Sequence, residues 1–192
     1  MKIIDILKQS CEMLGLFDQV KLLDAATETT EQETLKDEEL NSLINLFRYS
    51  IQELCSNYIP IITVEEMVEK SPKYEISLLK NYIRIQGIYK NETPVRYKII
   101  NRCIFFEESD KYSIHYETYP EINSMFEEIN YLDNFSPDVL VFGLASYYTL
   151  SRGRFDEFEM FHNEYVQKAE SLRGLKSFKL PQRRWEWKQK KR

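Results

Sequence analysis

Residues 37–58 hold the strongest constraint on the fold, an unbroken apolar stripe at the spacing of an α-helix. Side chains at i, i+3, i+4 and i+7 lie on one face of a helix, so the stripe predicts a long amphipathic helix. Asp37 can accept hydrogen bonds from the free N–H groups at its start, and Pro60 prevents continuation past its end. The stripe consists of Leu40, Leu43, Ile44, Phe47, Ile51, Leu54, Cys55 and Tyr58.

After residue 60 the apolar period changes from 3.6 to 2, and β-branched and aromatic residues replace the helix formers. Residues 95–106 look extended between turns at 91–94 and 109–110. The pattern therefore predicts a small antiparallel sheet over residues 61–118, with a first strand at its start. One face of the last strand is expected to carry Tyr112, Ile114 and Tyr116.

Helices are also predicted on either side of these two regions. Residues 3–14 show apolar spacings of three and four before Gly15, while residues 24–39 are polar and acidic and predict a connecting loop. Ser136-Pro137-Asp138 is a helix start, and a final helix is expected to stop at Gly174. The expected fold is mainly α with a β insertion (α+β). It combines a four-helix bundle-like core, a sheet inserted between the second and third helices, and an extended C-terminal tail.

Composition excludes several classes of protein. With 43% hydrophobic and 30% charged residues, the chain resembles a soluble globular protein rather than a disordered one. Its longest apolar runs are far shorter than the roughly 20 residues that cross a bilayer, so we expect no membrane segment. Charges in the first eight residues argue against a signal peptide, and three cysteines without a Cys-x-x-Cys pair fit a reducing compartment. We expect synthesis in the cytoplasm.

Charge divides the chain into two regions. The chain has 26 basic and 31 acidic residues, a net charge of −5. Residues 174–192 hold eight cations and one anion, a net of +7, so residues 1–173 hold 18 cations and 30 anions, a net of −12. We expect a helical body over 1–173, with its β insertion at about 61–118, and an extended basic aromatic tail over 174–192.

No catalytic constellation stands out in the sequence. His115 and His162 lack a partner at metal-ligand spacing, and Cys11, Cys55 and Cys103 fall on core stripes or strands, where a free cysteine acts as a small hydrophobe. Adjacent acidic pairs are expected by chance in so acidic a chain, and five glycines make no phosphate-binding loop. We predict that the protein is not an enzyme and has no cofactor or metal.

The tail is the region that most clearly predicts binding. Its apolar residues are spaced by two, which places each pair on one face of an extended strand, and such a peptide cannot bury them against itself. A partner groove with aromatic anchors and a cationic fringe would fit. Nucleic acid is the alternative partner, because basic residues interleaved with aromatics contact phosphates and stack on bases. The candidate partner-binding residues are Phe178, Leu180, Arg183, Arg184, Trp185, Trp187 and Lys188.

The order of parts resembles the head-to-tail adaptor, or connector, proteins of tailed bacteriophages, in particular those of short-tailed phages. The resemblance covers nearly the whole chain. It rests on the combination of short motifs along the chain, namely MLGL at 13–16, YIP at 58–60, YSIHYETYP at 112–120, LASYY at 144–148 and RRW at 183–185.

The resemblance implies a structural protein of the virion neck. Such proteins form a ring, typically of twelve copies, that docks on the portal protein, joins it to further tail or neck proteins and continues the DNA exit channel. Their C-terminal segment commonly embraces the portal or a neighbouring subunit. A ring of acidic bodies would let genomic DNA pass without specific binding, since like charges give no counterion-release gain. The alternative function is a small nucleic-acid-binding module that uses the tail.

Overall fold

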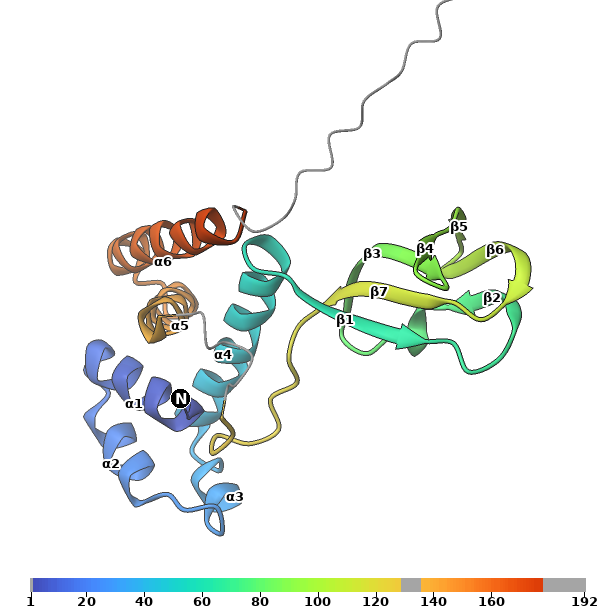
Figure 1. Cartoon of the computed structure of the whole chain (residues 1–192). Helices are drawn as coiled ribbons and strands as arrows, with labels where there is room; N and C mark the ends of the chain where they lie inside the picture. The colour runs from blue at the N-terminus through green and yellow to red at the C-terminus, as the bar shows by residue number, and fades with distance from the viewer. Residues whose placement is uncertain (1, 129–135, 178–192) are drawn as a thin grey trace, which may run out of the picture.

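The computed structural model describes residues 2–128 and 136–177 and has a mixed α+β fold (Figure 1). Six α-helices form one part of the molecule, and all the named strands lie in the sequence between the fourth and fifth helices. The helices are α1 (Ile3–Leu14), α2 (Phe17–Ala25), α3 (Glu31–Thr34), α4 (Glu38–Asn57), α5 (Pro137–Ser151) and α6 (Phe155–Ser177).

The insertion consists of two antiparallel sheets that pack on each other. One has the strand order β1-β7-β3-β4 and the other β2-β6-β5. A 3-10 helix, Ile76–Leu78, links β2 to β3. The strands are β1 (Ile61–Glu66), β2 (Ser71–Glu75), β3 (Tyr82–Lys90), β4 (Thr93–Pro94), β5 (Tyr97–Ile100), β6 (Cys103–Asp110) and β7 (Ser113–Thr118).

The predicted long helix is confirmed as α4, and its ends follow the signals in the sequence. The Asp37 side chain accepts a hydrogen bond from the Leu40 N–H at 2.9 Å, which caps the first turn. Every member of the apolar stripe except Tyr58 is buried, and Tyr58 is half-buried directly after the helix, which ends before Pro60. Gly15 at the end of α1 and Gly153 after α5 both adopt positive φ, as helix-terminating glycines do.

Helix α5 is the centre of the helical part. It packs against α1, α4 and α6, and it is buried on most of its circumference rather than along one stripe. Gly143 lets α6 approach closely, because a Cβ at this position would meet the Tyr165 ring at 3.1 Å. The core residues of α1 and α4 belong to the same cluster, so these helices form one bundle-like core.

The insertion has a second core between its two sheets. Tyr112, Ile114 and Tyr116 are buried there, which confirms the face predicted for the last strand. Opposite them, Ile104 and Phe106 of β6 come from the other sheet, and Phe106 stacks on Tyr112 with ring centroids 4.0 Å apart. The insertion therefore has a hydrophobic core separate from that of the helical part.

Several sequence predictions differ from the structure. The insertion was expected between the second and third helices, but it lies between the fourth and fifth, because α2 and α3 come before α4. The predicted loop at 24–39 contains α3 and the end of α2, which are short and carry little apolar periodicity. Residues 95–106 form a β5–β6 hairpin, because Asn101 and Arg102 adopt positive φ without a glycine to mark the turn. Strand β6 runs through the turn predicted at 109–110, and the insertion has two sheets instead of one.

Candidate partner-binding surfaces

The predicted docking residues lie outside the described residues. These are Phe178, Leu180, Arg183, Arg184, Trp185, Trp187 and Lys188. The structure corrects the point at which the extended tail was expected to begin, since α6 continues through Gly174 to Ser177. A glycine inside a helix costs only about 1 kcal/mol relative to alanine, so it does not oblige the helix to stop.

The limits of the β insertion show which part of the chain carries the net negative charge. Residues 61–118, which contain every named strand, hold nine acidic and nine basic residues and are neutral overall. The net charge of −12 therefore belongs entirely to residues 1–60 and 119–173, which hold 21 acids and nine bases. The excess of acidic residues is thus a property of the helical part, while the insertion carries no net charge.

The acidic segment 24–39 makes ordered contacts. Glu31 accepts hydrogen bonds from Ser124 Oγ at 2.8 Å and from the Met125 N–H at 2.7 Å, more than 90 residues along the chain. Nearby, the backbone N–H of Ile4 donates to the Met125 carbonyl at 2.8 Å. The segment after β7 is therefore held from two sides, by α1 and by α3.

Two carboxylates of α4 hold the neighbouring helices. Glu39 accepts a hydrogen bond from the Tyr148 hydroxyl at 2.5 Å and pairs with Arg152 at the end of α5. Towards the other end of α4, Glu53 accepts from the Tyr165 hydroxyl. Burial, followed by this hydrogen bond, raises the pKa of Tyr165 well above its ordinary value. Both carboxylates therefore link α4 to the helices packed beside it.

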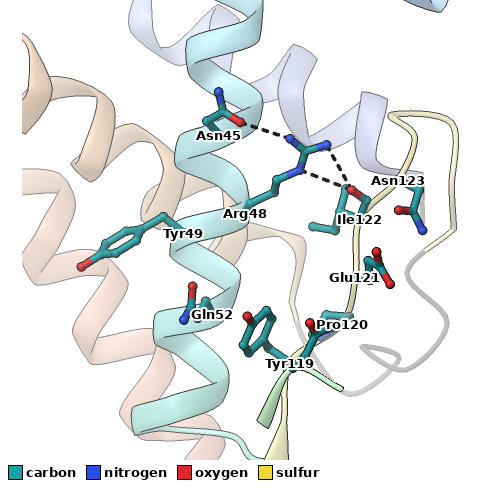
Figure 2. Close-up of a pocket in the computed structure, with 10 residues that line it drawn as sticks. Asn45, Arg48, Tyr49, Gln52, Tyr119, Pro120, Glu121, Ile122 and Asn123 are labelled. Carbon is teal, nitrogen blue, oxygen red and sulfur yellow. Dashed lines mark hydrogen bonds between the residues drawn. The ribbon is translucent and has the colours of Figure 1, made fainter. Parts of the chain in front are cut away.

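A polar pocket of about 570 Å³ lies between α4 and the segment after β7 (Figure 2). Arg48 spans it: its Nε and Nη2 atoms donate to the Ile122 carbonyl at 3.3 and 3.1 Å, and Nη1 donates to Asn45 at 3.1 Å. Arg48 thereby holds the segment after β7, residues 119–128 (called the linker below), against α4. The lining residues are Asn45, Arg48, Tyr49, Gln52, Asn81, Tyr119, Pro120, Glu121, Ile122 and Asn123.

Glu117 is a fully buried carboxylate in the central strand β7. Its Oε2 atom lies 2.6 Å from Arg84 Nε, and Oε1 accepts a hydrogen bond from Gln86. Both partners come from β3, and the hydrogen bond that Arg84 donates to Glu117 raises the pKa of Arg84. The carboxylate therefore links strand β7 to strand β3.

Histidines and cysteines occupy packed positions. His115 contacts the Tyr89 ring with centroids 4.5 Å apart, and His162 stacks on Phe158 at 5.0 Å. Cys11 and Cys55 are buried, as predicted. Burial, with smaller contributions from Glu39 and other nearby acids, raises the pKa of Cys11 to about 12, so it is a poor nucleophile at neutral pH.

Metal and membrane features are absent from the described part of the chain. Within it, no three His, Cys, Asp or Glu side chains converge as a metal site would require. None of the helices in residues 2–128 and 136–177 combines the length and the apolar character needed to cross a bilayer.

Comparison with known proteins assigns no family. No protein-family model matches the sequence, and no curated protein matches it. The adaptor resemblance thus stays a prediction from its motifs, and the function has to be argued from the residues.

Sequence reasoning missed the contacts of the acidic segment and the pocket on α4. Glu31 is one of many acids in an apolar-poor stretch, and nothing local distinguishes it from Glu33. The pocket joins residues about 70 positions apart in sequence, and a single sequence carries no signal for that pairing. The zero net charge of residues 61–118 can be counted from the sequence, but its contrast with the acidic helical part becomes clear only when the limits of the insertion are known.

Proposed function

We propose that this protein is a structural, non-enzymatic adaptor of a bacteriophage neck, which forms a ring, docks on the portal and joins it to the tail. The observation that carries the proposal is the placement of charge. A net charge of −12 lies in the helical part, the β insertion is neutral, and residues 174–192 carry +7. A binding module for nucleic acid would be expected to present a basic folded surface instead.

The acidic helical part suits the lining of a DNA passage. Duplex DNA carries one negative charge per ≈1.7 Å of its axis, and binding to it is driven by release of condensed counterions to basic groups. A ring of acidic helical parts offers few such groups, so DNA passes without being held. Carboxylates such as Glu28 and Glu38, exposed near α3 and α4, would add to this repulsion.

The basic segment after α6 suits attachment to the portal. Trp185 and Trp187 are the only tryptophans in the chain, and they lie among basic residues. Buried tryptophans at the centre of an interface commonly contribute about 2 kcal/mol or more each. Repetition around a ring multiplies these contacts, because each attached copy raises the effective concentration of the next.

Removal of the segment tests this role. A variant that stops after Ser177 keeps the whole of α6, whereas a cut at residue 173 would shorten the helix. We expect the shortened variant to keep the thermal midpoint of the full chain and to lose attachment to isolated portal rings under the electron microscope. A matched variant, Trp185→Ala with Trp187→Ala, keeps the cations and separates anchoring from charge. Full occupancy of portal rings by the shortened variant would refute portal docking through this segment.

The same variants decide between the two candidate functions. Nucleic-acid binding predicts a gel shift with the full chain that weakens steeply as salt rises and disappears in the shortened variant. The adaptor proposal predicts no retained duplex DNA at physiological salt, because the acidic helical part opposes it. A shift that survives physiological salt would favour the binding module.

A further inference from the structure

Strand β1 is an open edge with apolar and acidic side chains. Within the described residues it pairs only with β7, so the backbone groups on its other side face away from the sheet. Ile62 and Val64 are 55% and 45% exposed on its outer face, and Glu66 follows them on that face. An exposed edge with apolar side chains is a template for pairing with another strand.

Strand β5 is a second open edge, with apolar and basic side chains. It pairs only with β6 among the described residues and bounds the other sheet. Ile100 is 52% exposed, Lys98 precedes it on the same face of the strand, and the exposed Arg96 lies directly before the strand begins. A groove of about 550 Å³ runs beside this strand. Figure 1 shows β1 and β5 at opposite margins of the insertion.

We propose that β1 of one copy pairs with β5 of the next copy, which joins neighbouring insertions into one continuous sheet. In the antiparallel register that places Ile62 opposite Ile100, Val64 lies opposite Lys98 and Glu66 lies opposite Arg96. Residues directly opposite each other share a face, so Ile62 meets Ile100 and the acid Glu66 meets the base Arg96. Val64 packs against the aliphatic part of the Lys98 side chain. Glu66 and Arg96 form no ion pair within the described residues, so both are free to make this one.

Charge also selects against the symmetric alternatives. A symmetric antiparallel pair of β5 edges in the matching register would place Lys98 opposite its own copy, and like charges directly opposite are destabilising. A symmetric pair of β1 edges would place Glu66 opposite Ile62, so it would form no ion pair. The remaining head-to-tail contact leaves one free edge at each end, so it generates a closed ring or an open filament. The neutral insertion is also where acidic copies can touch at least electrostatic cost. The pairing of the two strand edges does not depend on the proposed adaptor function. Only the expectation that the paired copies close into a ring rests on that function.

Charge exchange tests the pairing. We expect Glu66→Arg and Arg96→Glu each to weaken self-association about tenfold, because attraction becomes repulsion, and the double variant to restore it. Both residues are exposed, so the fold should tolerate the changes. Glu164→Arg on α6 is the matched control, since it alters the net charge equally on an exposed helix position. Sedimentation velocity at low salt measures the assembly. A double variant no better than the single variants would refute the pairing, as would a Glu66→Arg variant that assembles like the control.

A disulfide test gives a second readout that does not depend on charge. In a Cys103→Ser background, Ile62→Cys and Ile100→Cys in one chain should yield covalent oligomers on oxidation, while either cysteine alone should yield monomers. Cβ atoms directly opposite in antiparallel strands lie about 4.5–5.5 Å apart, close to the reach of a disulfide. Covalent dimers from Ile62→Cys alone would show a symmetric contact and overturn the proposal, and so would a double variant that stays monomeric. Covalent open filaments would support the pairing but contradict the ring.

Discussion

Glu31 joins the acidic segment to the linker after β7, and its replacement by alanine has a predictable cost. Its carboxylate accepts from Ser124 Oγ at 2.8 Å and from the Met125 N–H at 2.7 Å. A hydrogen bond to a charged group contributes about 1.5–3 kcal/mol net. The side chain is half-buried, so the lower end applies to each bond and the loss is about 3 kcal/mol. For a chain of this size that lowers the thermal midpoint by about 6–12 °C.

Glu33→Ala is the matched control for this measurement. It removes the same charge from the same short helix, and the Glu33 side chain is exposed. Surface changes of this kind usually stay within about 0.5 kcal/mol. Thermal unfolding followed by circular dichroism compares the two variants with the parent chain. If Glu31→Ala melts at the same temperature as Glu33→Ala, the linker is not held by this carboxylate and the reasoning fails.

Two further predictions concern buried groups. The pKa of Cys11 is raised from 9.0 to about 12, so its thiol stays neutral below pH 9. Iodoacetamide should therefore label Cys103 in the folded chain and spare Cys11. Equal labelling of the two cysteines, measured by mass spectrometry, would contradict this prediction. Replacing Arg84 with Met leaves the Glu117 carboxylate buried without its cation and should destabilise the fold by about 3 kcal/mol. Adding Glu117→Leu should recover most of that loss in a urea titration, and no recovery would rule out the buried charge as its cause.

The helices that could be predicted are those whose local signals agree with their packing. In α4 the apolar stripe, the Asp37 cap and Pro60 all point to one helix, and the structure buries that same stripe. The start of α5 at Pro137 was equally clear. Short helices such as α3 have no buried residue, so their sequence carries little apolar pattern to detect.

Turns without glycine and contacts between distant segments could not be predicted in the same way. Asn101 and Arg102 make a tight turn at φ values of 49° and 60°, which the sequence does not mark because Arg seldom adopts that region. The contact of Glu31 with Met125 depends on how α3 and the linker meet in space. The complementary edges of β1 and β5 required the strand order, although their charges are plain in the sequence.

The mass of the complex formed with isolated portal rings tests the central proposal most directly. The purified full chain is mixed with portal rings, and native mass spectrometry counts the bound copies. The adaptor proposal predicts a discrete complex with a complete ring of copies on each portal, lost when the chain stops after Ser177. Portal rings that keep their own mass in the presence of excess protein would contradict the proposal.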